Sequence, residues 1–303
     1  MASLGTYESF QNCFRLRIEQ GGSLQGGGGK RGQIKGLSKG SRRKLVFLIN
    51  SFAPVQDAFF VTLTVREASE DFKQWKKWLN RTLMGLRYKF PQLSGIWRLE
   101  FQKSGTPHFH ILLFTNTPID PKVLRSTIRQ YWSSACGKQN TGYFNTKRKH
   151  WVYKGIRVEK VRDIRKSGFY LAIYQAKNEQ DRTDIPTGKT WGILNKEALP
   201  IGRYEGGEFE TLRFNMWCKR LYRRYIKANG ASTRSPLFRS LKSRDKGFTG
   251  FLSRSLQRKF FALCRDLSKE AKRTAPAEHH EYCRSLPSLV DDSQDDFKNR
   301  KSA

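Results

Sequence analysis

Apolar and polar residues follow two different spacings over residues 58–162, and each spacing predicts one type of secondary structure. Short runs of β-branched and aromatic residues are typical of strands, whereas apolar residues three or four positions apart are typical of amphipathic helices. Strands are therefore predicted at 59–65, 96–102, 108–114 and 156–161, and helices at 71–88 and 120–136. The resulting order, β-α-β-β-α-β, is that of the ferredoxin-like or RRM-like fold. We expect an α+β domain whose antiparallel sheet places its first and third strands side by side, with helices packed on it.

The segments on either side of this pattern differ from it in composition. Residues 1–40 are predicted to be a flexible, Gly-rich basic arm, because residues 20–44 hold too few apolar side chains to build a core. A short helix is predicted at 41–52, with Ser41 as its N-cap. Further helices are predicted at 165–177, 211–228 and 250–274, with a basic linker at 230–250 and a disordered end. The expected domains are the arm at 1–40, a central domain at 41–228, and a linker, helix and tail at 229–303.

The charge of the chain narrows the class of partner. Its 58 Lys and Arg residues outnumber 26 Asp and Glu residues, which gives a formal net charge of +32. Such an excess is favourable beside a polyanion, so nucleic acid is the expected partner, although charge alone selects no mechanism. Five scattered Cys without a CxxC pair indicate a reducing, cytoplasmic location, and no apolar run is long enough to span a membrane.

The stretch GTPHFHILLF, residues 105–114, places His108 and His110 on one face of a predicted strand. If the KSGTP loop sets Gln102 opposite His108, then Glu100 falls opposite His110 on the same face. Such a set suits a divalent ion that keeps open positions for a phosphate oxygen and water. Mg²⁺ and Mn²⁺ are the expected ions, with Zn²⁺ as the less favoured choice. The alternative is a half-buried, hydrogen-bonded histidine pair without a ligand.

The stretch GFYLAIYQAKNEQ, residues 168–180, is predicted to be helical and adds a candidate nucleophile. Its core stripe consists of Phe169, Ala172, Ile173 and Ala176. Tyr170, Tyr174 and Lys177 form a second stripe, displaced by roughly a third of a turn because successive residues step by ~100°. An aromatic stripe commonly belongs to a core, but here other residues supply the core face. A phenol is a weak nucleophile at neutral pH, and a metal ion or Lys177 nearby would stabilise its phenolate.

Three segments, in order, resemble the motifs of HUH endonucleases, specifically rolling-circle replication initiators of plasmids and single-stranded DNA phages. They are FFVTLTV at 59–65, RLEFQKSGTPHFHILLF at 98–114 and YLAIYQAK at 170–177, and the resemblance extends over residues 36–202. The resemblance implies that His108 and His110 bind a metal ion together with Glu100 or Gln102. It also implies that Tyr170 or Tyr174 attacks single-stranded origin DNA and becomes linked to the 5′ phosphate. The released 3′ hydroxyl would prime synthesis, and the second tyrosine would accept the strand that closes the circle.

One position departs from the family pattern. Two-tyrosine members often carry Lys immediately before the second tyrosine, where this chain has Ile173, so that Lys177 is the matching base. The departure concerns the use of both tyrosines, whereas the metal ligands match.

The remaining expectations concern partners and competing classes. The TGKT stretch at 187–190 lacks the Gly of a phosphate-binding loop, because Thr183 stands at that position. Unwinding and synthesis are therefore expected from a host helicase and a host polymerase. The competing class is a non-catalytic single-stranded DNA or RNA binding protein whose RRM-like sheet stacks bases. Transposases and relaxases compete within the enzyme class, and the oligomeric state is left open.

Overall fold

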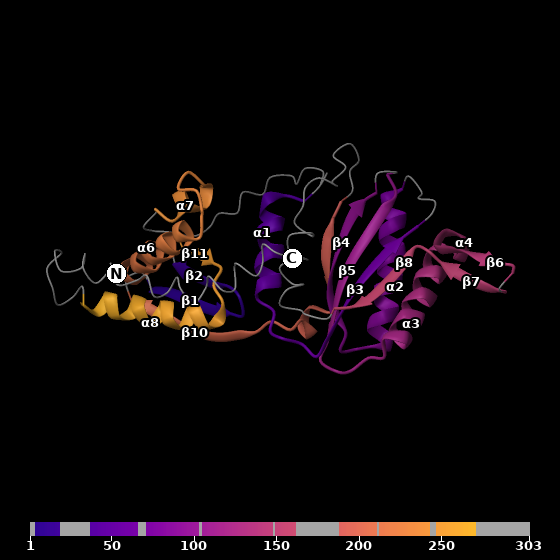
Figure 1. The fold of residues 1–303 in the computed structure, drawn as a ribbon, viewed down its shortest axis with the longest axis horizontal. Coiled ribbons are helices and arrows are strands. Elements are labelled where there is room, and N and C mark those ends of the chain that lie inside the picture. Colours follow the sequence, from indigo (N-terminus) through magenta and orange to yellow (C-terminus); the bar gives the residue numbers. More distant parts are fainter. Residues whose placement is uncertain are drawn as a thin grey trace. The chain divides into compact units, whose positions relative to one another are not determined.

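The computed structural model describes residues 4–18, 37–65, 71–102, 105–147, 149–161, 188–210, 212–242 and 247–270. The chain forms two compact units, one made of Gly27–Ile201 and the other of Met1–Gly26 together with Gly202–Ala303. Each unit is described by itself, and Figure 1 labels the elements of both. No helix in these described ranges is long and apolar enough to cross a membrane.

The Gly27–Ile201 unit, called the sheet unit below, is built on a five-stranded antiparallel sheet. Its strands are β3 (Asp57–Thr64), β4 (Ser94–Phe101), β5 (Pro107–Thr115), β8 (Ile156–Lys160) and β9 (Trp191–Leu194), in the order β8-β3-β5-β4-β9. Its helices are α1 (Lys39–Asn50), α2 (Phe72–Lys89), α3 (Pro121–Cys136) and the short α4 (Lys138–Thr141), with a 3₁₀ turn at Lys196–Ala198. The predicted β-α-β-β-α-β order and the central pairing of β3 with β5 are confirmed.

Two features of the sheet unit were not predicted. β9 extends the sheet beside β4, and β6 (Gly142–Asn145) pairs with β7 (His150–Tyr153) in a separate two-stranded hairpin. Each of these strands has four residues, which is too short for the alternation of polar and apolar positions to be read reliably.

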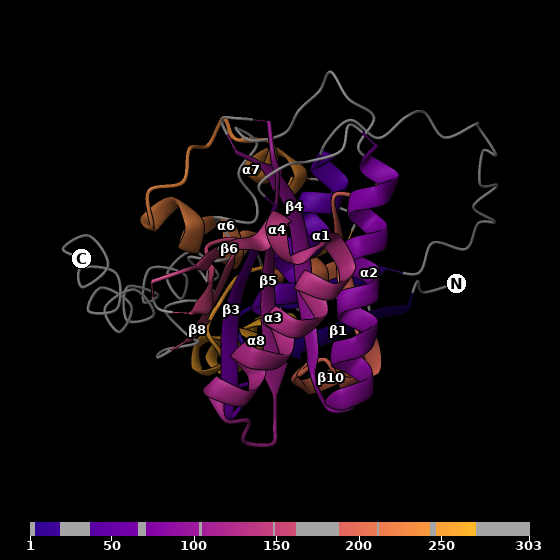
Figure 2. The ribbon, with the colours of Figure 1, turned by 90° about the vertical axis from the view of Figure 1, so that its right-hand side faces the viewer.

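Helices cover the two faces of the sheet unequally. α2 and α3 lie together over one face, as Figure 2 shows, and bury the inward residues of β3, β4 and β5. That core includes Phe59, Leu63, Trp75, Leu79, Trp97, Phe109, Ile111 and Trp132. On the other face α1 packs Leu45 and Ile49 against Ile96, Leu112 and Phe114. His108 and His110 share this second face with Leu112 and Phe114, since residues two apart on a strand point the same way.

Local signals account for the helix boundaries. The side chains of Asp71 and Asp120 cap α2 and α3 by accepting from the backbone N–H two residues on, at 2.8 Å each. Pro121 occupies the first turn of α3, where a missing N–H costs nothing. For α1 the predicted cap is wrong, because the helix begins two residues earlier and Ser38, not Ser41, is the N-cap.

The second unit combines the two ends of the chain around another antiparallel sheet. Its strands are β1 (Leu4–Phe10), β2 (Phe14–Ile18), β10 (Arg203–Glu210) and β11 (Phe248–Gly250), in the order β10-β1-β2-β11. Its helices are α6 (Leu212–Ala228), α7 (Pro236–Ser240) and α8 (Arg254–Glu270). Phe14 lies in its core, with edge-on ring contacts to Tyr222, Phe248 and Phe261.

This second unit corrects the predicted domain boundaries. Residues 4–10 and 14–18 form strands rather than part of a flexible arm, and the predicted linker at 230–250 contains α7 and β11. The cause is long-range pairing, because β1 takes β10 as a partner about 200 residues later. The helices predicted at 211–228 and 250–274 are present as α6 and α8, but both belong to this unit. Most of the Gly-rich segment, residues 19–36, lies outside the described residues.

Candidate functional site

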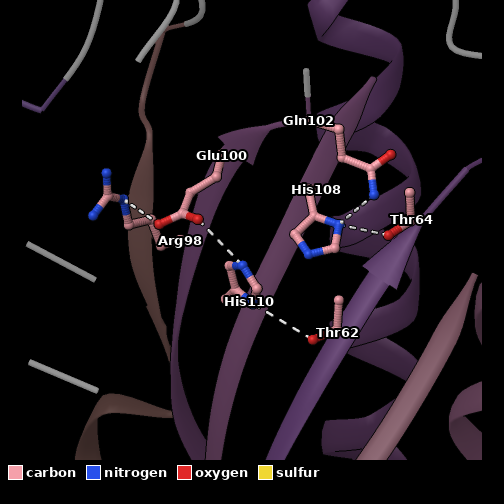
Figure 3. Close-up of polar contacts among 7 residues, drawn as sticks. All are labelled: Thr62, Thr64, Arg98, Glu100, Gln102, His108 and His110. Atoms are coloured by element: carbon pink, nitrogen blue, oxygen red, sulfur yellow. Dashed lines mark hydrogen bonds and ion pairs between the residues drawn. The ribbon is translucent and has the colours of Figure 1, made fainter. Parts of the chain in front are cut away.

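The candidate site lies where β3 ends and β5 begins, on the sheet face opposite α2 and α3 (Figure 3). His108 and His110 project from this face, while Phe109 between them is buried in the core on the other side. Each imidazole contacts a threonine of the neighbouring strand. Thr64 Oγ1 lies 2.6 Å from His108 Nδ1, and Thr62 Oγ1 lies 3.4 Å from His110 Nδ1. The strand pairing therefore orients both rings.

The predicted register between β4 and β5 is wrong by two residues. Glu100, rather than Gln102, pairs with His108 in the sheet, because the chain turns more tightly than a KSGTP loop implies. Pro107 already belongs to β5, and the Gln102 backbone N–H donates to the Thr106 carbonyl at 3.0 Å. A shift of two residues keeps every side chain on its predicted face. Gln102 still reaches the site, with Nε2 3.5 Å from His108 Nδ1.

Glu100 links the histidines to a residue that the sequence did not single out. Its Oε2 lies 3.2 Å from His110 Nε2, and its Oε1 lies 3.4 Å from the Nε of Arg98, which pairs with His110 across the sheet. Both Arg98 and Glu100 are buried, with side-chain exposures of 0% and 2%. Since a lone buried carboxylate is strongly unfavourable, the guanidinium of Arg98 compensates the charge of Glu100.

Aromatic contacts hold the two imidazoles in place. The His110 ring is stacked on Phe60, with centroids 5.3 Å apart and planes at 15°. The His108 ring lies edge-on to His110 at 4.4 Å. Because His110 touches Phe60 on one side and His108 on another, its rotamer is restricted by packing as well as by Thr62 and Glu100.

The electrostatic environment favours a neutral His108. Burial, followed by the neighbouring His110, lowers the pKa of His108 to about 4, and the charge of Glu100 only partly opposes this. At physiological pH the ring is therefore neutral, which is the form that binds metal ions. Its Nδ1 faces Thr64 and Gln102, and in Figure 3 its Nε2 points away from both. No hydrogen bond to Nε2 is found within the described residues.

The donors at this site fit a divalent ion in chemical type. Two imidazoles and one carboxylate share a face, and Glu100 Oε1 is buried without a hydrogen bond from the described residues. An ion would satisfy that oxygen and the open Nε2 of His108. In the described parts of the chain no three His, Cys, Asp or Glu side chains already converge as a metal group. The reason is local, since Glu100 Oε2 contacts His110 Nε2 directly and an ion would replace that contact.

Comparison with known proteins agrees with this position of the site. Residues 58–179 match the family model of replication-associated protein ORF2. The match runs from β3 through β8 and includes both histidines and both predicted tyrosines, and it supports a role in replication initiation. No curated protein matches the chain.

Among solved structures, the chain is similar to the crystal structure of the hypothetical protein ORF119 from Sulfolobus islandicus rod-shaped virus 1. The two chains are 17% identical, and the similarity covers 46% of this chain and 96% of that one, with a TM-score of 0.26.

Within the residues matched by the replication-associated family, those predicted for the site fall into two groups. Those predicted to bind metal, His108, His110, Glu100 and Gln102, lie together on β4, β5 and the turn between them. Those predicted for catalysis, Tyr170, Tyr174 and Lys177, lie outside the described residues and stay predictions. Sequence reasoning missed Arg98, Thr62 and Thr64. The available signal for Arg98 was a charged residue two positions before Glu100, on the same face of an otherwise apolar strand.

Proposed function

We propose that this protein initiates DNA replication by nicking one strand of origin DNA, with a tyrosine as nucleophile and a divalent metal ion as cofactor. The observation that carries the proposal is the His108, His110 and Glu100 cluster, which lies within the residues matched by the replication-associated family. Such a cluster has a clear use in phosphoryl transfer, where charge on the phosphate must be stabilised.

The side chains that would hold the ion are His108 and His110, with Glu100 and Gln102 as the oxygen donors. Mg²⁺ and Mn²⁺ suit this mixed set best, because they accept carboxylate and amide oxygen. When bound, the ion would supply Lewis-acid polarisation of the scissile phosphate. Thr64 and Thr62 would keep the two imidazoles oriented, as partners behind metal ligands commonly do.

The nucleophile is Tyr170 or Tyr174, with Lys177 stabilising the phenolate that attacks. In this step the phenolate oxygen forms a bond to phosphorus, and the bond from phosphorus to the 3′ oxygen breaks. The strand is left with a free 3′ hydroxyl, and the 5′ phosphate is held as a tyrosine ester. Because one phosphate ester replaces another, the same reaction in reverse rejoins strands. A host polymerase would extend the 3′ hydroxyl, and a host helicase would unwind the duplex.

A covalent-capture experiment tests the proposal. The protein is incubated with Mn²⁺ or Mg²⁺ and a labelled single-stranded DNA library of random sequence, and adducts are separated under denaturing conditions. We expect an adduct from the wild type, a loss in the Tyr170→Phe/Tyr174→Phe double variant, and sequencing of the captured DNA to reveal the preferred site. Tyr88→Phe is the matched control, since that ring is 89% exposed on α2. Absence of an adduct from every protein would overturn the enzymatic proposal and favour the binding-only class.

A further inference from the structure

The β6–β7 hairpin exposes large aromatic side chains close to the candidate site. β6 and β7 pair only with each other within the described sheets, and in Figure 1 they lie beyond α3 and β8 in the sheet unit. A two-stranded hairpin is marginally stable on its own and has no third strand to cover its side chains. Tyr143 is 43% exposed and Phe144 is 48% exposed. Because they are adjacent on β6, they point to opposite faces of the hairpin.

The charge around these rings is uniformly positive. No Asp or Glu occurs between Pro121 and Val158. Lys147, Lys149 and Lys154 are exposed, and Lys154 Nζ lies 5.3 Å from the centroid of the Tyr143 ring. Interleaved aromatic and basic side chains are typical of surfaces that stack bases and contact phosphates of single strands.

The base of the hairpin is fixed to the strand that orients His108. The Thr64 backbone N–H donates to the Gly155 carbonyl at 2.7 Å, two residues after β7. The side chain of the same threonine contacts His108 Nδ1, and its carbonyl accepts from the Trp132 indole N–H at 3.3 Å. Gly155 has no room for a side chain, because an added Cβ would lie 2.3 Å from the Thr64 carbonyl oxygen. Phe144 therefore lies within roughly 10 Å, about three strand residues, of this attachment.

Further contacts hold the hairpin base rigidly. The carbonyl of Thr141 accepts from the N–H groups of Lys154 and Gly155, both at 3.1 Å. The Thr141 hydroxyl is buried and lies 2.9 Å from Ser133 Oγ on α3. The Arg129 guanidinium lies over the Tyr153 ring at 5.4 Å. A firmly held base with exposed aromatic residues beyond it presents those rings at a defined place, which lowers the entropy lost on binding.

We propose that the β6–β7 hairpin binds unpaired bases of single-stranded DNA beside the candidate metal site. Tyr143 and Phe144 stack on bases, while Lys147, Lys149 and Lys154 contact the phosphates on either side. The proposal rests on the proposed function in taking DNA as the ligand. It adds a binding site that would hold the strand next to His108. Duplex DNA is a poorer ligand for this surface, because its bases already stack on one another.

Binding measured without metal separates this site from the chemistry. The probes are a fluorescent single strand of random sequence, about 20 nucleotides long, and the duplex of the same length. With EDTA present, Phe144→Leu is expected to weaken single-strand binding about tenfold and to leave duplex binding unchanged. Phe144→Trp keeps a stacking ring and should retain the affinity. Tyr88→Leu, which removes an exposed ring from α2, is the matched control and should change neither affinity.

The lysines are tested through salt dependence. Lys147→Ala/Lys149→Ala should lower the slope of log affinity against log salt for single strands by about 1.4, since each phosphate contact contributes about 0.7. Phe144→Leu should leave that slope unchanged, because stacking releases no counterions. Thermal unfolding of each variant confirms that the fold is retained.

Two results would overturn the hairpin proposal. One is an unchanged single-strand affinity in a folded Tyr143→Leu/Phe144→Leu variant, and the other is an equal loss for single-stranded and duplex DNA. The covalent-capture assay on the same variants keeps this failure distinct from that of the proposed function. Adducts with unaltered affinity refute the hairpin site alone. Reduced affinity, with no adduct from the wild type, refutes nicking and leaves the hairpin site in place.

Discussion

In the sheet unit the buried Glu100 carboxylate contacts His110 and Arg98, and its Oε1 accepts no hydrogen bond from the described residues. In the second unit the buried side chain of Gln257 is fully satisfied. Its Nε2 donates to the carbonyls of Phe10 and Leu252, at 2.8 and 2.7 Å, and its Oε1 accepts from Ser9. Both side chains are almost inaccessible to water, at 2% and 0% exposure. They differ in what is left for a ligand to do.

This difference separates structure from chemistry. A buried polar group that has every hydrogen bond fixes a fold, whereas one that lacks partners can gain energy from a ligand. Positive charge does not separate the units in the same way. α2 in the sheet unit and α6 in the second unit each carry six Lys or Arg and no Asp or Glu. We therefore expect both units to bind DNA and only the sheet unit to react with it.

The largest effect is expected from removing a metal-binding histidine. His108→Ala should reduce adduct formation about 1,000-fold, because metal stabilisation of the transition state amounts to several kcal/mol. Single-strand affinity in EDTA should stay within about threefold of the wild type, since basic residues elsewhere supply most of it. Single-turnover adduct assays and anisotropy provide the two measurements.

The control for this experiment is His279→Ala, which lies outside the residues matched by the replication-associated family and should leave the adduct yield unchanged. Normal cleavage by His108→Ala would show that the metal assignment is wrong. The contrast between reactive and structural polar groups would then lose its main example.

Breaking the buried ion pair should be next in size. Arg98→Met leaves Glu100 buried without its compensating charge and is expected to lower the free energy of unfolding by about 3–5 kcal/mol. Adding Glu100→Gln to this variant removes the stranded charge and should restore much of the stability. Urea denaturation of the single and double variants measures the coupling. A cost below about 1 kcal/mol for Arg98→Met would contradict the role given to this pair.

The polar pair used for the comparison can be tested directly. Gln257→Leu removes the partners of Ser9 and of the Phe10 and Leu252 carbonyls, and should cost about 2–3 kcal/mol of stability. Adduct formation at saturating DNA should be unchanged. Glu100→Gln should behave in the opposite way, with stability altered little and adducts strongly reduced. If Gln257→Leu also abolished adducts in a folded protein, the division between the units would be wrong.

Neutralising surface charge tests whether both units contact DNA. Changing Arg220, Arg224 and Lys227 of α6 to Gln, or Lys73, Lys77 and Arg81 of α2 to Gln, removes three exposed charges in each case. Each triple variant should lose roughly tenfold in affinity at moderate salt and show a shallower salt dependence. Cleavage at saturating DNA should stay normal. A loss confined to the α2 variant would restrict DNA binding to the sheet unit.

The sheet was predictable because each of its main elements carries a strong local signal. FFVTLTV is β-branched and aromatic throughout, and α2 repeats apolar residues at helical spacing over 18 residues. β1 and β2 have weaker patterns, and their pairing with β10 and β11 depends on segments near the other end of the chain. Local periodicity contains no information about such partners, and for this reason the amino-terminal strands were assigned to a flexible arm.

For the site, the sequence predicted the face and missed the register. The strand alternation placed His108, His110 and Glu100 on one side whichever way the hairpin closed, because a two-residue shift preserves sidedness. The pairing itself depends on whether Pro107 belongs to the loop or to the strand, which no local pattern decides. Arg98 was overlooked because arginine is rarely fully buried, and its partner became evident only from the contact with Glu100.

The smallest effect is expected from the buried thiols, which compare the opening of the two units. Burial raises the pKa of Cys136 in the sheet unit to about 12, and its Sγ donates to the Trp132 carbonyl at 3.0 Å. In the second unit, burial and then the neighbouring Cys264 raise the pKa of Cys218 well above its usual value. Since the thiolate is the reactive form, only about one molecule in ten thousand would be reactive at Cys136 at pH 8. Labelling in the native state should therefore wait for each unit to open.

The sign of the pH dependence follows from the same shifts. The folded state keeps its proton at Cys136 while the unfolded chain loses one above its ordinary pKa near 9, so stability should fall as the pH rises from 9 towards 12. Cys136→Ala should remove this part of the alkaline loss at a cost of about 1 kcal/mol. Rates of thiol labelling, resolved by mass spectrometry, would compare Cys136 with Cys218. Equal rates at all denaturant concentrations would mean that the two units unfold together, and different rates would mean that they are independent in stability as well as in chemistry.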